Sequence, residues 1–115
     1  MRIVVLLVLF QMMPALAYAG NPENGEKLFM KKCKSCHRLT EGTKVGPSLL
    51  GVTQRRSEEW LQKWLQNPKA MLNGGDPIAV ELLKKYKKRM PKLKMMQTKE
   101  NRDDVISFLR KYVVN

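Results

Sequence analysis

The pattern of apolar and polar positions divides most of the chain into four amphipathic segments separated by turn-forming residues. Apolar residues recur within each segment at helical spacing. The expected helices are residues 24–34, 57–67, 77–89 and 98–113. Ser57, Asp76 and Thr98 stand at the starts of the last three segments and are good N-cap residues. No segment alternates as a strand would, so the sequence predicts an all-helical domain.

The stretches between these helices contain residues that favour irregular structure. Residues 38–50 include Gly42, Gly46 and Pro47 and show no sustained period, which predicts a loop. Pro91 disfavours helical geometry at the residue before it, so we also expect Met90 to lie on an irregular segment.

The first nineteen residues have the features of an export signal. Arg2 precedes an apolar run, and residues 17–19 (Ala-Tyr-Ala) supply the small-x-small pattern at which signal peptides are cut. We predict a cleaved signal peptide at residues 1–19 and a mature domain at residues 20–115, in a periplasmic or otherwise exported protein. An uncleaved membrane anchor is the competing interpretation, but Pro14 interrupts a stretch that is too short to span a bilayer.

The chain is strongly basic. Its net charge is +12, and this becomes +11 without residues 1–19, because Arg2 is the only charged residue among them. Such a charge speeds encounters with acidic partners or anionic membranes, although a basic surface that only keeps the protein soluble is an alternative. No nucleic-acid-binding motif accompanies the charge, so we expect no binding to DNA or RNA. The stability of so small a domain is marginal when it comes from apolar burial alone. We therefore expect a further component in its core.

The motif Cys33-Lys34-Ser35-Cys36-His37 is the strongest chemical signal, because C-x-x-C-H is the pattern to which c-type haem is attached. Two thiols about one helical turn apart can reach the two vinyl groups of one porphyrin edge, and the adjoining imidazole can bind the iron. The sequence therefore predicts one haem c, bound covalently through Cys33 and Cys36, with His37 as an iron ligand.

Three other interpretations of this motif fit less well. A structural zinc site needs four ligands, and the chain has only two cysteines and one histidine. A thiol-disulfide oxidoreductase would carry C-x-x-C at the start of a helix in a βαβ unit, a setting that the pattern lacks. Two unmodified thiols would be disfavoured in an oxidising compartment.

Beyond this motif, the chain resembles the class I cytochrome c family over nearly all of the mature region. The matching segments are Gly25 with Phe29, residues 46–52 (GPSLLGV), residues 64–69 (WLQNPK) and residues 90–93 (MPKL). The resemblance implies the cytochrome c fold, with four to five short helices wrapped around one covalent haem. It also implies that Phe29 meets Phe108 where the first and last helices cross.

The resemblance further implies roles for three residues at the haem. The carbonyl group of Pro47 would accept a hydrogen bond from His37, Trp64 would line the haem pocket, and Met90 would be the second iron ligand. Met95 and Met96 are rivals for that last role. The residues expected to bury the porphyrin are Phe29, Trp64, Leu65 and Phe108.

An iron with both axial positions filled can only change charge, so we expect a one-electron carrier and not an enzyme. The alternative is a haem protein with an open or labile distal site, which would bind small ligands or perform redox catalysis. We expect a monomer that docks transiently with acidic redox proteins and has at most weak contact with membrane surfaces. The lysines expected around the haem edge are Lys27, Lys34, Lys44, Lys63, Lys92 and Lys94. The lysine-rich segment 77–89 has no assigned role.

Overall fold

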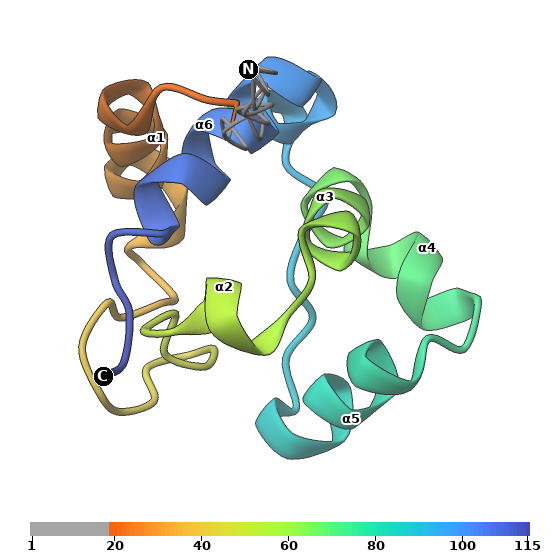
Figure 1. Ribbon diagram of the computed structural model, residues 1–115. Helices are drawn as coiled ribbons and strands as arrows, with labels where there is room; N and C mark the ends of the chain where they lie inside the picture. Colours follow the sequence, from red (N-terminus) through yellow and green to blue (C-terminus); the bar gives the residue numbers. More distant parts are fainter. Residues whose placement is uncertain (1–18) are drawn as a thin grey trace, which may run out of the picture.

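The computed structural model describes residues 19–115, which form helices joined by loops (Figure 1). The α-helices are α1 (Pro22–Leu28), α2 (Val52–Arg55), α3 (Glu58–Gln66), α4 (Pro68–Asn73), α5 (Pro77–Tyr86) and α6 (Lys99–Leu109). A π-helical turn, η1 (Phe29–Cys33), extends α1, and a 3-10 turn, η2 (Lys94–Gln97), precedes α6. No strand occurs in this range, so the prediction of an all-helical domain is confirmed. The predicted signal peptide lies almost entirely outside the described residues.

The helices α1 and α6 cross closely on one side of the molecule, where Figure 1 shows them in orange and blue. Glycine at position 25 permits this approach, because a Cβ there would lie 2.8 Å from the Cβ of Phe108 and would also collide with the carbonyl group of Asp104. Beside the crossing, the rings of Phe29 and Phe108 pack at a centroid distance of 5.5 Å. The expected meeting of these two aromatic residues is confirmed.

A buried carboxylate fixes the start of α1 to α6. Asp104 is only 4% exposed, and its Oδ1 accepts a hydrogen bond from the backbone N–H of Asn21 at 2.6 Å. Its Oδ2 accepts from the side-chain amide of Asn24 at 2.7 Å. Both carboxylate oxygens therefore have hydrogen-bond donors, which offsets part of the cost of burying this group.

The apolar core lies between α1, α3 and α6. Its buried members are Phe29, Cys33, Val52, Leu61, Leu65, Met96, Val105, Ile106, Phe108 and Leu109. Met96 has no exposed surface, and its carbonyl oxygen accepts a hydrogen bond of 2.8 Å from the guanidinium of Arg102. This methionine is therefore a core residue.

Helix starts agree with the sequence more closely than helix ends do. The side chains of Ser57, Asp76 and Thr98 each accept a hydrogen bond from the first turn of the helix that follows, so all three predicted N-caps are confirmed. The helix α5 ends at Tyr86 and not at residue 89, because Lys87 adopts left-handed geometry with φ of 60°. Similarly, α6 ends at Leu109 and not at residue 113.

Two short helices have no counterpart in the predicted pattern. The helix α2 follows Gly51, whose φ is 72°. The helix α4 begins at Pro68, and the side chain of Asn67 caps it by accepting a hydrogen bond of 3.1 Å from the N–H of Ala70. Residues 19–115 thus contain six α-helices where four to five were expected.

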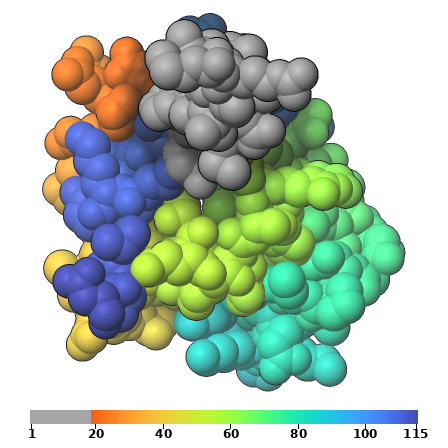
Figure 2. Space-filling model, viewed as in Figure 1, coloured from red at the N-terminus to blue at the C-terminus, as the bar shows by residue number. Residues whose placement is uncertain are grey.

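The second half of the fold surrounds a large cavity. The helices α3, α4 and α5 and the irregular segment around Met90 stand on one side of it, and the end of η1 with the loop after it stands on the other. Across the face shown in Figure 2, the yellow-green atoms of the α2–α3 region meet the teal atoms of α5. Within residues 19–115 we find no helix with both the length and the apolar character needed to cross a membrane.

Candidate haem-binding site

The cavity has a volume of about 1490 Å³ and a predominantly apolar lining. Pockets for ordinary small molecules measure roughly 300–1,000 Å³, so this one has room for a ligand as large as a porphyrin. All six residues singled out from the sequence line it, namely Cys33, Cys36, His37, Pro47, Trp64 and Met90.

The π-helical turn η1 and the tight turn after it place the C-x-x-C-H residues on the cavity wall. The backbone N–H groups of Cys36 and His37 both donate to the carbonyl oxygen of Cys33, at 3.1 and 3.0 Å. Cys33 is buried, whereas Cys36 and His37 are half-buried. Single π-helical turns often occur at functional sites, and this one brings two thiols and an imidazole to one surface.

The imidazole of His37 is held in one orientation. Its Nδ1 lies 2.8 Å from the carbonyl oxygen of Pro47. A carbonyl oxygen only accepts, so Nδ1 carries the proton and the neutral ring keeps a lone pair on Nε2. Burial lowers the pKa of His37 below its usual 6.5, although the hydrogen bond to Pro47 opposes the shift. The ring is thus favoured in the neutral form that binds metals, and the expected contact with Pro47 is confirmed.

Glycine is required beside this ring. A Cβ at position 46 would lie 2.7 Å from Cε1 of His37 and 3.1 Å from its Nδ1. The loop can therefore approach the face of the imidazole only because residue 46 has no side chain.

The alternative chemistries for the cysteines fit the geometry poorly. Burial, with a smaller contribution from Cys36, raises the pKa of the Cys33 thiol to about 11. Thiol-disulfide oxidoreductases need the opposite shift, since the thiolate is their attacking form. In the described part of the chain, no cluster of three or more His, Cys, Asp or Glu side chains is arranged to hold a metal ion, as a zinc site would require.

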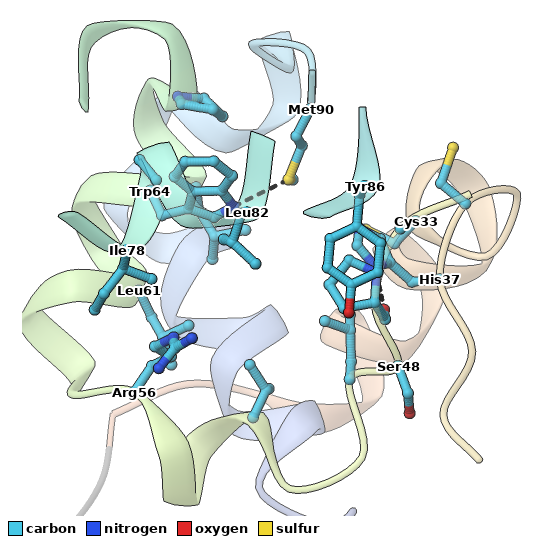
Figure 3. Close-up of a pocket in the computed structure, with 18 of the residues that line it drawn as sticks. Cys33, His37, Ser48, Arg56, Leu61, Trp64, Ile78, Leu82, Tyr86 and Met90 are labelled. Carbon is cyan, nitrogen blue, oxygen red and sulfur yellow. Dashed lines mark hydrogen bonds between the residues drawn. The ribbon is translucent and has the colours of Figure 1, made fainter. Parts of the chain in front are cut away.

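Met90 lies on the wall opposite His37. Figure 3 shows Met90 and Trp64 on one side of the space and His37 and Cys33 on the other. The indole Nε1–H of Trp64 donates to the sulfur of Met90 at 3.2 Å. Met95 packs against the core and Met96 is buried in it, and neither residue lines the cavity. Among these three methionines, Met90 alone presents its thioether to the space that His37 faces.

Several residues that line the cavity were not singled out from the sequence. Ile78, Leu82 and Tyr86 on α5 line the cavity (Figure 3), although the sequence predicts only that they lie within one amphipathic segment. Arg55 and Arg56 add two guanidinium groups, which suit the two carboxylates of a haem, and nothing in the sequence distinguished them from other basic residues. Phe108 does not line the cavity, because it lies behind Phe29 in the core.

These features together fit a haem. The lining is apolar, two thiols lie beside an imidazole whose Nε2 is free to bind iron, and a soft thioether faces them from the opposite wall. The cavity also explains how so short a chain forms a core, since a large apolar group would complete it.

Comparison with known proteins agrees with this interpretation. The sequence profile of the family described as Cytochrome c matches residues 22–112. Cytochrome c of Dictyostelium discoideum is 32% identical over 101 residues, which cover 78% of this chain and 89% of that protein. Cytochrome c of Chlamydomonas reinhardtii is 35% identical over 104 residues, which cover 84% and 93% of the two chains.

Solved structures extend the likeness to the fold. The structure of cytochrome c from Rhodothermus marinus matches with a TM-score of 0.72 at 30% sequence identity, over 79% of this chain and 75% of that one. The cytochrome c fold expected from the sequence is therefore confirmed. The chain belongs to the cytochrome c family, and it is an electron carrier with one haem c attached covalently through Cys33 and Cys36.

Proposed function

We propose that this protein is an exported one-electron carrier whose haem iron is bound by His37 and Met90. The observation that carries the proposal is the placement of the His37 ring and the Met90 sulfur on opposite walls of one cavity (Figure 3). With both axial positions taken by the protein, no position is left for oxygen, peroxide or an organic substrate.

Each residue then has a distinct task. His37 offers the lone pair of Nε2, and Pro47 keeps the ring oriented by accepting its Nδ1–H. Met90 offers a thioether, a soft ligand that favours the reduced iron and raises the reduction potential. Trp64 holds the Met90 sulfur in place through its N–H group. The haem, when attached, supplies the exchange between the ferric and ferrous states.

The ligand assignment can be tested by replacing one methionine at a time in the haem-containing protein. Met90→Ala should abolish the near-infrared absorption band that arises from a methionine–iron bond. Met95→Leu is the matched control, because Met95 packs against the core without lining the cavity, and it should keep the band. A band that survived in Met90→Ala would disprove the assignment.

Cations at the cavity rim support docking to acidic redox proteins. Residues 84–94 contain seven lysines and arginines and no acidic residue. Those that line the cavity are Lys85, Lys88, Arg89 and Lys92, joined by Lys69 from α4. Of the six lysines expected at the haem edge, Lys92 alone lines the cavity. We assign the first contact with an acidic partner to this rim, which gives the lysine-rich segment a role.

Docking of this kind should weaken with salt. The rate of electron transfer with an acidic redox protein should fall as ionic strength rises, because salt screens exposed charges. Lys88→Glu should slow the reaction at low salt more than Lys111→Glu does, since Lys111 is also exposed but does not line the cavity. Equal effects of the two substitutions would argue against the rim as the docking site.

The carrier is proposed to act as a monomer, and sedimentation analysis should find one.

The packing of Gly20 supports a mature domain that begins at this residue. A Cβ at position 20 would collide with the carbonyl group of Asp103 and lie 3.0 Å from the Cβ of Ser107. The folded part of the chain is thus in contact with α6 immediately after the proposed cleavage site. Amino-terminal sequencing of protein secreted to the periplasm should find Gly20 first, and a sequence that began at Met1 would refute the cleavage.

A further inference from the structure

Two tryptophans on α3 form a stack that runs from the molecular surface to the iron-ligand region. Trp60 and Trp64 are four positions apart, so a helix brings their side chains to the same face. Their ring centroids lie 5.1 Å apart, and the two ring planes are tilted by only 13°. Both residues are half-buried and line the cavity wall.

Each end of the stack is attached to a particular group. At the inner end, the N–H of Trp64 donates to the sulfur of Met90 at 3.2 Å (Figure 3). At the outer end, the N–H of Trp60 donates to Oδ2 of Asp76 at 3.0 Å, and the Arg56 guanidinium lies 5.7 Å from the centre of the Trp60 ring. Each step from Arg56 through the two indoles to Met90 is therefore a ring contact or a hydrogen bond.

Such a series has electronic consequences that apolar packing does not have. Electrons tunnel more readily through bonded, hydrogen-bonded and closely stacked groups than across gaps between atoms. Leucine at either position could fill similar space, but it would offer neither a π system nor an N–H donor. The carboxylate of Asp76 adds electron density to the outer indole, which brings its filled orbitals closer in energy to those of a donor.

The outer end of the stack lies on a face of mixed charge. Around Trp60 the charged groups are Arg56 and Asp76, which are half-buried, and the exposed ion pair between Lys63 and Glu59, whose N–O distance is 3.0 Å. Positive and negative groups balance here, in contrast to the wholly basic segment 84–94. A carrier needs to exchange electrons with both a donor and an acceptor, and two faces of different charge can serve two partners.

We propose that the Trp60–Trp64 stack is an electron route that couples the surface at Trp60 to the iron ligand Met90. The partner that uses it is a one-electron redox protein whose contact patch carries little net charge. The partner loses one electron and the haem iron gains it. No bond forms or breaks, no proton moves, and the two indoles bridge the transfer without being oxidised. This inference rests on the proposed function, because it needs Met90 as a ligand.

A photochemical experiment can test the route without knowledge of the natural partner. His37 is the only histidine of the chain, so Glu59→His creates a unique exposed imidazole beside Trp60, to which a photoactive ruthenium complex can be bound as the donor. Lys85→His provides a second attachment point at the cavity rim. Flash excitation then gives the rate of intramolecular electron transfer to the haem from each point.

The substitution Trp60→Leu should slow transfer from position 59 about tenfold, equivalent to ~1.4 kcal/mol in an activation barrier. Transfer from position 85 should not change. Trp60→Phe keeps a stacked ring and should lose much less. Tyr112→Leu, which removes a half-buried aromatic ring outside the stack, should leave both rates unchanged.

The reduction potential and the methionine–iron band are recorded for every variant. They give the driving force and the ligation of each variant, so that a slower rate in Trp60→Leu, compared at equal driving force, reports electronic coupling and not a displaced ligand. Unchanged transfer from position 59 would overturn the route, and so would an equal loss from both positions. If instead the unsubstituted protein lacks the methionine–iron band, the proposed ligation fails, and the route fails with it.

Discussion

The Nδ1 atom of His37 lies 2.8 Å from the carbonyl oxygen of Pro47, and this contact joins the haem-attachment motif to the loop that follows it. The two residues are ten positions apart, and Gly46 brings the loop against the face of the ring. The orientation of the His37 ring therefore depends on Gly46, which has no side chain that could bind a ligand.

Gly46→Ala should destabilise the haem-containing protein. The added Cβ would stand 2.7 Å from Cε1 of His37, so the ring or the loop must move. Overpacking of this kind costs about 1–3 kcal/mol of unfolding free energy. Denaturant unfolding followed through the haem absorption measures the loss. Gly74→Ala is the control, because position 74 has an ordinary φ of −75°, lies outside the site, and would bring its Cβ no nearer than 3.2 Å to the Ala70 carbonyl oxygen. Equal midpoints for Gly46→Ala and the parent would contradict the account.

Trp64→Phe should lower the reduction potential. The substitution keeps an aromatic ring but removes the N–H that donates to the Met90 sulfur. Without this hydrogen bond the sulfur donates more electron density to the iron, which favours the ferric state. The expected shift is below ~59 mV, the change equivalent to tenfold in a one-electron equilibrium. Potentiometric titration checks it, and a potential that is equal to or higher than that of the parent would exclude this role for the indole.

Asp104→Ala should destabilise the crossing of α1 and α6. It removes the acceptor for the backbone N–H of Asn21 and for the side chain of Asn24. Hydrogen bonds to a charged group contribute about 1.5–3 kcal/mol, and these two are part-buried. The free energy of unfolding should therefore fall by that amount, whereas Glu100→Ala, at an exposed position of the same helix, should change it by less than ~0.5 kcal/mol. Similar values for both variants would show that the buried carboxylate contributes little.

Acid should destabilise the protein partly through Asp76. Two hydrogen bonds lower the pKa of Asp76 below its ordinary 3.8. The one from Trp60 has the larger effect, and the one from the N–H of Ala79 has the next largest. A lowered pKa gives stability that is fully present above the unfolded-state value and disappears as pH falls through the folded-state value. Asp76→Asn retains a good N-cap but has no charge, so its melting temperature should decline less steeply below about pH 4. Melting temperatures that fall in parallel with pH for Asp76→Asn and the parent would contradict this role of Asp76.

The sequence was sufficient wherever a single residue type determines the local structure. The C-x-x-C-H spacing predicted the attachment site, and Ser57, Asp76 and Thr98 predicted three helix starts, since each side chain can satisfy backbone N–H groups of the helix that follows. Pro91 placed Met90 on an irregular segment by steric exclusion alone.

Structure was needed where neighbours in space decide the outcome. The sequence predicts only that a helix ends at residue 67, yet Asn67 also caps a new helix that begins at Pro68. Lys87 ends α5 in left-handed geometry, for which lysine carries no sequence signal. The apolar face of α5 was visible in the sequence, but only the fold shows that it faces the cavity and not the core of the protein.

The claim on which the functional account depends is that His37 and Met90 close the iron on both sides. The most direct test is the absorption spectrum of the reduced, haem-containing protein before and after the addition of carbon monoxide at neutral pH. A closed iron should give the same low-spin spectrum in both states. Conversion to a carbonyl-haem spectrum on mixing would show an open or labile distal site, and the protein would then be a ligand-binding haem protein.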